Sequence, residues 1–209
     1  CRRLDRGAGL EVEPGRSRKE CVETRLLLHP RGGPWRAYRL DTDRSGCLLV
    51  ARGKTALVEA QAGVQDRQVR KLYWAVVVGT LPQDSGEIDA PLLRKSGPSG
   101  WRMVVDAKGD EARTRWRVLG RGKGLCWVEL ELLTGRTHQA RIHCAALGTP
   151  ILGDTLYGAS AGSSLPGLHL LARSLELNLP SDTLAAEASP PDFMAETLRR
   201  MGCEGVIQS

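Results

Sequence analysis

Long apolar runs are absent from this 209-residue sequence. The two longest cover residues 47–51 and 74–78, whereas a helix that crosses a membrane needs roughly 18 or more apolar residues in a row. The hydrophobic fraction of 41% and the charged fraction of 26% are those of an ordinary globular protein. Membrane-spanning, fibrous and disordered classes are therefore excluded, and a chain of this length buries enough surface to fold without a disulfide or a metal ion.

Cysteine is sparse: the six cysteines lie far apart, and the sequence contains no C-x-x-C pair. Secreted disulfide scaffolds are usually short and rich in cysteine, and this chain is neither. We therefore interpret the cysteines as reduced thiols in a cytosol-like compartment. The bacterial cytoplasm is the first expectation for the location of the protein, and the mitochondrion is the second.

Several catalytic and metal-binding motifs are also missing. The sequence contains no glycine-rich phosphate loop followed by lysine, no G-x-S-x-G turn and no H-E-x-x-H helix. His138 and His143 are five residues apart, so a helix turns them roughly 140° from each other and away from a shared metal ion. Residues 41–46 (DTDRSG) fill positions 1, 3, 5 and 6 of a calcium loop, but position 12 is Arg52 instead of a glutamate. We therefore expect no metal site.

Positive charge is concentrated in one part of the chain. The net charge is +6, and residues 94–123 contain nine basic and three acidic side chains, so this stretch alone carries 9 − 3 = +6. Arginine outnumbers lysine 24 to 6, and its flat guanidinium suits phosphate contacts and stacking on bases, although a GC-rich genome would also favour arginine. Because the stretch also contains Trp101 and Trp116, we interpret it as a candidate nucleic-acid footprint.

The apolar pattern predicts an α+β fold with a central mixed, mostly antiparallel sheet flanked by helices. Residues 1–19 are expected to be a loop, and no repeat or linker divides the chain, so a single domain is predicted over residues 1–209. Helices are predicted at residues 20–29, 54–68, 137–147 and 192–201, the third capped by Thr137. Strands or extended segments are predicted at residues 37–40, 47–52, 71–79, 112–119, 125–133 and 168–179.

Two charged residues stand out, but the pattern does not decide their roles. Asp41 is a lone acid beside a tight turn, where an aspartate usually forms the turn itself. In an extended segment Arg39 would share its face. Arg141, near the start of the helix predicted at residues 137–147, could direct its guanidinium at a carboxylate or form an ordinary surface ion pair. The spacing of residues along the sequence does not decide between these alternatives.

Three sequence blocks resemble those of the RluA family of RNA pseudouridine synthases. Residues 38–46 (YRLDTDRSG) resemble the family motif H-R-L-D-x-x-T-S-G, and residues 70–75 (RKLYWA) resemble R-K-x-Y-x-A. Residues 133–143 (LTGRTHQARIH) resemble L-T-G-R-T-H-Q-I-R-V-H, and residues 146–154 (ALGTPILGD) follow, close to A-L-G-H-P-I-L-G-D. The blocks occur in the family's order and cover the chain from about residue 37 to its end.

The resemblance implies an isomerase, with the family's catalytic domain as its fold, that converts specific uridines in ribosomal or transfer RNA to pseudouridine. It implies that Asp41 is the catalytic carboxylate, that Arg141 pairs with it, and that Tyr73 stacks on the target base. No metal, cofactor or energy source is needed, because the base is detached, turned and rejoined through carbon. RNA is then the expected partner, and the protein is expected to be a monomer.

The resemblance also implies a set of RNA contacts. Arg39 corresponds to the arginine that helps to fill the gap left when the uridine flips out of its stack. Lys71, Arg136 and His138 are further candidates, although Lys71 and Arg136 could be solvated charges. His138 and Gln139 could equally belong to the structure of the helix start.

The sequence departs from the family at three positions of the supporting shell. Tyr38 stands where the family has histidine, Arg44 where it has threonine, and Leu171 where a late L-H-A block has histidine. An alternative function is therefore a catalytically silent RNA-binding relative that acts in ribosome assembly. The family's early strand with its N-K-P signature is missing, and we expect further residues before Cys1.

Overall fold

The structure is a computed structural model that divides into two compact units. Residues 1–71 with 171–191 form the first unit, and residues 72–170 with 192–209 form the second. The predicted helix at residues 20–29 and the extended segment at 37–40 lie outside the described residues, and the single domain over 1–209 stays a prediction. The structure describes residues 2–6, 35–36, 45–51, 53–66, 68–98, 100–158, 167–179 and 183–203, the first two ranges by their backbone alone.

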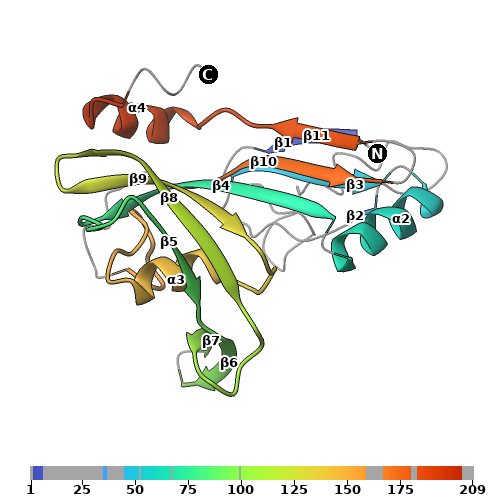
Figure 1. Cartoon of the computed structure of the whole chain (residues 1–209), viewed down its shortest axis with the longest axis horizontal. Coiled ribbons are helices and arrows are strands. Elements are labelled where there is room, and N and C mark those ends of the chain that lie inside the picture. Colours follow the sequence, from blue (N-terminus) through green and yellow to red (C-terminus); the bar gives the residue numbers. More distant parts are fainter. Residues whose placement is uncertain are drawn as a thin grey trace. The chain divides into compact units, whose positions relative to one another are not determined.

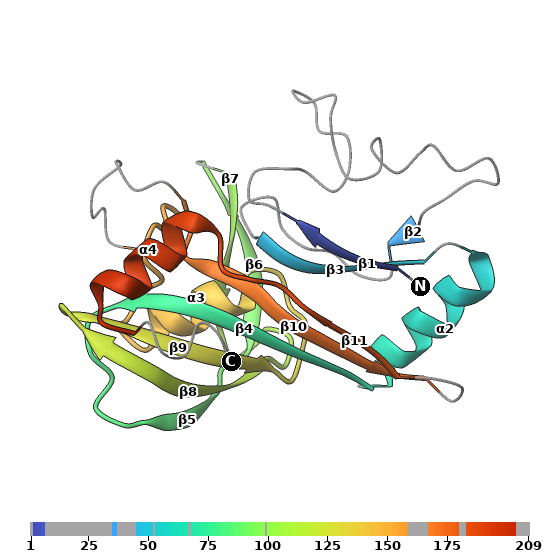
Figure 2. The same cartoon turned by 90° about the horizontal axis from the view of Figure 1, so that it is seen from above.

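The first unit is built on a mixed sheet (Figures 1 and 2). Strand β3 (Ser45–Ala51) pairs antiparallel with β1 (Arg2–Arg6) and β2 (Trp35–Arg36), and parallel with β10 (Leu170–Asn178). Strand β10 in turn pairs antiparallel with β11 (Thr183–Glu187). All seven residues of β3 are buried, which is typical of a strand covered on both faces.

Helix α2 (Lys54–Gln65) belongs to the same unit and buries the stripe that its spacing predicts. Ala60 and Gly63 are buried, and Leu57 and Val64 are half-buried. A Cβ atom at Gly63 would lie 2.7 Å from Cδ1 of Leu177. The small residues therefore let the helix lie close to strand β10.

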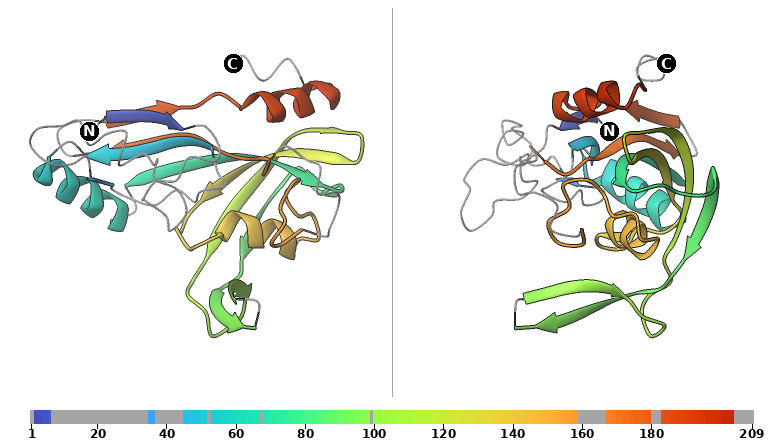
Figure 3. Two further views of the ribbon diagram at one scale, coloured as in Figure 1. Left: turned by 180° about the vertical axis from the view of Figure 1, so that it is seen from behind. Right: turned by 90° about the vertical axis from the view of Figure 1, so that its left-hand side faces the viewer.

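The second unit contains an antiparallel sheet in the order β4 (Val69–Val78), β9 (Leu125–Leu132), β8 (Arg113–Gly122) and β5 (Ser85–Asp89). Helices α3 (Gln139–Ala146) and α4 (Asp192–Arg200) lie on opposite faces of it (Figures 1 and 3). Coverage on both faces explains why β4 is buried without interruption from Tyr73 to Val77. No helix in the described ranges is long and apolar enough to cross a membrane.

A tight turn joins β8 to β9. Lys123 and Gly124 have φ angles of 54° and 73°, and two consecutive positive φ angles are typical of the two-residue type I′ turn whose twist suits a hairpin. Strand β8 therefore extends to Gly122, beyond residue 119, where the predicted strand ends. A register shift between Val118 and Gly120 marks a bulge in β8.

A second hairpin, β6 (Leu92–Gly97) with β7 (Gly100–Val105), projects from the second unit as a separate two-stranded ribbon (Figure 3). Its base is anchored because Leu92 and Met103 are buried in a cluster with Ala112 and Ile142 of helix α3. The residues toward its tip, from Arg94 on β6, are exposed.

The predicted α+β class is confirmed, and so are the helices at residues 54–68 and 192–201 and the strands at 47–52, 71–79, 112–119, 125–133 and 168–179, with shifts at their ends. The predicted loop at residues 1–19 is wrong at residues 2–6, which form β1, and its other residues lie outside the described ones. The predicted cap Thr137 is wrong as well: α3 begins at Gln139, and its N-cap is His138. Strands β5, β6, β7 and β11 were not predicted, because apolar and polar residues do not alternate regularly along them.

Gly46 should be essential for the pairing of β3 with β10. Its φ is +112°, and a Cβ there would lie 2.3 Å from the carbonyl oxygen of Ala172. Gly46→Ala is therefore expected to lower the free energy of unfolding by roughly 2 kcal/mol or more, measured by urea denaturation. Gly97→Ala is the control, because its closest atom would be 3.8 Å away. Equal stability of the two variants would contradict this reading of Gly46.

Candidate active site

Gln139 organises the loop that precedes helix α3. Its Oε1 accepts hydrogen bonds from the hydroxyl of Thr134 at 2.8 Å and the backbone N–H of Arg136 at 3.0 Å. Its Nε2 donates to the carbonyl oxygen of Arg113 and to Oγ1 of Thr114, both at 2.9 Å. The amide thus uses both donors and both acceptor positions, as a fully buried glutamine must to avoid a desolvation cost. Gln139 has a structural role in this loop.

His143 continues this polar network inside the second unit. Its Nδ1 lies 2.8 Å from Oγ1 of Thr114, and its Nε2 lies 3.0 Å from the carbonyl oxygen of Ala90. Burial lowers the pKa of His143, although the Ala90 carbonyl and the charge of Asp89 act in the opposite direction. The imidazole is therefore neutral near pH 7, with Nε2–H donating to Ala90 and Nδ1 accepting from Thr114.

The Arg141 guanidinium, on helix α3, forms a buried, forked ion pair with Asp154. Nε and Nη2 donate to the two carboxylate oxygens at 2.8 and 2.7 Å, and the side chains are 2% and 0% exposed. The backbone N–H groups of Leu156 and Tyr157 donate to Asp154 Oδ1 at 3.0 Å. Burial raises the pKa of Asp154, but Arg141 and these N–H groups outweigh it, so that the pKa lies below its ordinary value of 3.8. The surface ion pair considered for Arg141 is excluded.

Tyr157 connects Arg141 to His138. Arg141 Cζ lies 5.3 Å from the centroid of the tyrosine ring, and the hydroxyl of Tyr157 lies 2.7 Å from His138 Nδ1. The same hydroxyl accepts the backbone N–H of Met103 at 3.3 Å. Burial raises the pKa of Tyr157, although this N–H and the charge of Arg141 act in the opposite direction. The phenol therefore keeps its proton at neutral pH and can donate it to His138.

His138 precedes the helix in a left-handed backbone conformation, with φ 55° and ψ 17°. Its ring stacks on Trp101 of β7, with centroids 5.6 Å apart and planes 25° apart. The predicted placement of His138 inside the helix is wrong, but the residue does lie with Arg141, because both contact Tyr157. Helix α3 thus brings two predicted site residues to one cluster.

Two other predicted site residues lie on strand β4, and a third precedes helix α3. Tyr73 and Lys71 are on β4, as their spacing predicts: Tyr73 is 5% exposed, and burial lowers the pKa of the half-buried Lys71. Arg136 is exposed, and its Nε donates to the carbonyl oxygen of Glu111 at 2.9 Å. Asp41 and Arg39 lie outside the described residues, so the pairing of Asp41 with Arg141 stays a prediction.

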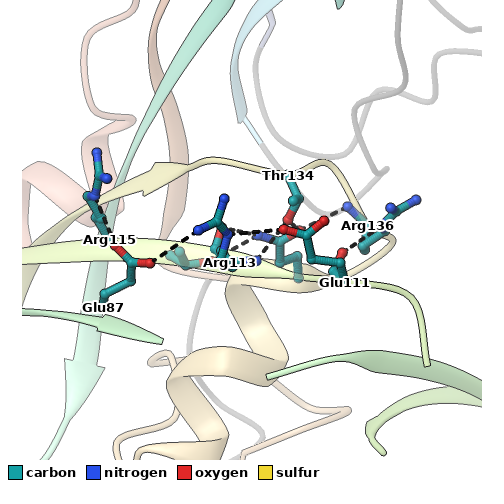
Figure 4. A network of polar contacts seen from close by, with 8 residues as sticks. Glu87, Glu111, Arg113, Arg115, Thr134 and Arg136 are labelled. Atoms are coloured by element: carbon teal, nitrogen blue, oxygen red, sulfur yellow. Dashed lines mark hydrogen bonds and ion pairs between the residues drawn. The ribbon is translucent and has the colours of Figure 1, made fainter. Parts of the chain in front are cut away.

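Ion pairs compensate most of the basic stretch at residues 94–123 (Figure 4). Arg113 and Arg115 share Glu87, and Arg113 also contacts Glu111. Further pairs join Lys95 to Asp106, Arg117 to Glu129, and Arg121 to Asp84. Trp116, the second tryptophan of the stretch, is buried. The net charge of +6 counted for residues 94–123 therefore overstates the positive electrostatic potential at strand β8.

Sequence reasoning missed the residues that support Arg141. Asp154 is 13 positions away and was visible only as the last letter of the family block at residues 146–154. Tyr157 lies beyond that block, and no helical or strand spacing links it to His138. Both contacts depend on tertiary folding, so local spacing carries no signal for them.

The Arg141–Asp154 pair should contribute strongly to stability as a unit. Arg141→Met and Asp154→Leu are each expected to lower the free energy of unfolding by about 3–5 kcal/mol, because each leaves a buried charge without its counterion. The double variant should lose clearly less than the sum, as measured by urea denaturation in a double-mutant cycle. The control cycle uses Arg117 and Glu129, whose exposed pair at 2.8 Å should couple by under about 1 kcal/mol. Additive losses at Arg141 and Asp154 would contradict the pairing.

The stability of the protein should fall as the pH drops below about 6.5, the ordinary pKa of His143 and His169, which are both buried. The folded-state pKa of His143 is lowered, so the unfolded chain binds its proton first and the folded state loses stability as pH decreases. His143→Gln should reduce this slope between pH 6.5 and 5, in urea denaturation at each pH. A residual slope remains in the variant because burial also lowers the pKa of His169. An unchanged slope would show that His143 does not carry the effect.

Comparisons with known proteins identify the family. The family described as RNA pseudouridylate synthase matches residues 4–146. An RNA pseudouridine synthase of Zymomonas mobilis, named as uncharacterized, is 40% identical over 194 residues, which are 90% of this chain and 89% of that protein. Ribosomal large subunit pseudouridine synthase D of Nitrosomonas europaea is 36% identical over 214 residues, which are 94% of this chain but 61% of that protein. The chain thus spans about three fifths of the latter relative.

Solved structures agree with this assignment. The human protein RNA pseudouridylate synthase domain containing 1 has a TM-score of 0.79 and 25% identity over 96% of this chain and 82% of its own. The human protein RNA pseudouridylate synthase domain containing 4 has a TM-score of 0.78 at 24% identity, which shows the same fold. The chain belongs to the RNA pseudouridylate synthase family, of RluA type, whose members are isomerases that convert uridine in RNA to pseudouridine.

Proposed function

We propose that this protein isomerises specific uridines in structured RNA through the carboxylate of Asp41. The observation that carries the proposal is the buried Arg141–Asp154 pair at the start of helix α3, inside a block that resembles the family's catalytic motif. The family match over residues 4–146 includes Asp41, Tyr73 and Arg141.

Arg141 is suited to hold a second carboxylate in addition to Asp154. A guanidinium has five N–H groups, and Asp154 takes two of them. We propose that Asp41 accepts a hydrogen bond from another of these groups. A buried cation that donates a hydrogen bond to a carboxylate favours the ionised form of that carboxylate and fixes its rotamer. Asp154 and Tyr157 hold the guanidinium in place, and they act on the reaction as positioning residues.

The reaction needs an ionised and correctly directed carboxylate. The bond between N1 of uracil and C1′ of ribose breaks, a new bond forms between C5 and C1′, the proton of C5 leaves, and N1 gains a proton. Asp41 is proposed to promote this exchange. Lys71 and Arg136 are proposed to contact the RNA backbone, Arg136 from the loop that Gln139 holds.

Tyr73 is proposed to stack on the target uracil and Arg39 to occupy the gap left in the RNA stack. Tyr73 is 5% exposed, and an enzyme that acts on a base must extrude it from its stack. Extrusion of the base costs a few kcal/mol, least where the nucleotide is not firmly paired. Such a cost favours uridines in loops or distorted helices.

Ribosomal RNA of a bacterial cytoplasm is the substrate that the relatives favour over transfer RNA. Proteins from Nitrosomonas europaea and Pseudomonas aeruginosa, 36% and 34% identical to this chain, are named ribosomal large subunit pseudouridine synthase D. We propose that this chain acts on the same class of RNA as a monomer.

Tritium release tests the function directly. RNA labelled at C5 of uridine, from cells that lack the protein, should release tritium with the natural protein and none with Asp41→Asn. Asp43→Asn is the matched control, because it removes a carboxylate two positions away in the same sequence block and should leave release unchanged. Release by Asp41→Asn would contradict its catalytic role. No release by the natural protein, with RNA binding intact, would overturn the activity in favour of a silent RNA-binding relative.

A further inference from the structure

The uncompensated positive charge of the basic stretch includes two arginines of the β6–β7 hairpin. Within the described residues, four of its nine basic side chains take part in no ion pair: Arg94, Arg102, Lys108 and Lys123. Of these, Arg94 and Arg102 lie on β6 and β7 themselves. The arginines of strand β8 face carboxylates instead, so the hairpin attracts anions more effectively than the sheet.

Trp101 is exposed beside these cations. It is 45% exposed, whereas the other tryptophan side chains that the structure describes, Trp74, Trp116 and Trp127, are at most 6% exposed. Trp101 pairs with Ser96 in the hairpin. Ser96 is two positions after Arg94 on β6, so Arg94 and Trp101 share a face. Arg94 Cζ lies over the indole, 4.5 Å from its centroid. An exposed aromatic ring next to an exposed cation is the combination that single-stranded nucleic acids bind.

A base can replace the arginine over the indole ring. An exposed cation–π contact contributes about 0.5–1 kcal/mol, whereas stacking of a nucleic-acid base on an aromatic side chain contributes about 1–3 kcal/mol. The exchange is therefore favourable, and it frees the Arg94 guanidinium to contact a phosphate of the same nucleotide chain.

Trp101 is also linked to the Arg141 cluster. Its ring stacks on His138 at 5.6 Å, His138 lies 2.7 Å from the Tyr157 hydroxyl, and the Tyr157 ring lies under the guanidinium of Arg141. All of these residues belong to the second unit. A base stacked on Trp101 would thus be connected to Arg141 through three side chains, those of Trp101, His138 and Tyr157.

We propose that the β6–β7 hairpin selects RNA by stacking an unpaired base, close to the target uridine, on Trp101, while Arg94 contacts the adjoining phosphate. The proposal rests on the proposed function in taking RNA as the ligand. It adds a specificity determinant: the substrate must offer an unpaired nucleotide beside the uridine that is modified. Trp101 is a substrate-positioning residue in this account.

The test compares the binding of two fluorescein-labelled RNAs, a stem–loop with an unpaired uridine-rich loop and a blunt duplex of the same stem. Trp101→Ala should weaken binding of the stem–loop about tenfold and leave binding of the duplex unchanged. Trp101→Phe should restore most of the affinity. Val105→Ala is the matched control, since Val105 is a 46% exposed apolar residue of the same hairpin. Equal affinities of Trp101→Ala and the natural protein for the stem–loop would overturn the proposal.

Salt dependence tests the role of Arg94. Arg94→Ala should reduce the slope of log K against log salt concentration by about 0.7, the value for one contact to a single strand. Arg117→Ala removes the same charge from an arginine that is paired with Glu129, and it should leave the slope unchanged. Equal slopes for the two variants would show that Arg94 makes no phosphate contact.

Tritium release separates this proposal from the proposed function. If the natural protein releases tritium, Trp101→Ala should lower kcat/KM about tenfold through KM, with the rate at saturating RNA preserved. If the natural protein releases tritium and Trp101→Ala leaves both RNA binding and kcat/KM unchanged, the role of the hairpin is overturned and the proposed function is not. No release by the natural protein, with stem–loop binding still dependent on Trp101, would overturn the activity and support the hairpin as an RNA-binding element.

Discussion

Arg141 and Asp154 are buried together, and the backbone N–H groups of Leu156 and Tyr157 and the ring of Tyr157 contact the pair. Removing either charge from solvent costs several kcal/mol, and only close, forked contacts with further hydrogen bonds recover that cost. The pair meets this condition, because two N–H groups of the following turn complete the shell of Asp154. In return the guanidinium has one orientation, which a residue that positions a second carboxylate requires. A surface arginine would lack this property.

The position of helix α3 depends on a second network of buried polar groups. Gln139 closes the loop before the helix against β8, and His143 joins the helix to Thr114 and to Ala90. The amide of Gln139 bonds to backbone groups of a loop and a strand and to short hydroxyl side chains, so the geometry tolerates little displacement. The block at residues 133–143 therefore combines structural residues with the arginine proposed to act at the site. The hairpin β6–β7 attaches to the same helix through Met103 and Ile142.

Sequence patterns predict the buried elements because burial imposes a period. Strand β9 alternates Val128, Leu130 and Leu132 with half-buried glutamates, and α2 buries residues at helical spacing. The hairpin β6–β7 carries charged and glycine residues held by backbone pairing, so no period shows. The role of Arg141 came from the resemblance to a family block. Its partner Asp154 could not be predicted, because an ion pair across 13 residues is set by how loop and helix pack.

Asp154 is proposed to act on the reaction through the orientation of Arg141. The most direct test is the single-turnover rate of pseudouridine formation by Asp154→Asn at saturating RNA, with the dissociation constant for the same RNA measured alongside. We expect a rate at least about tenfold lower, with RNA affinity unchanged, because a small displacement of a positioning group has a large effect on rate. A folded Asp154→Asn protein that forms pseudouridine at the natural rate would contradict it.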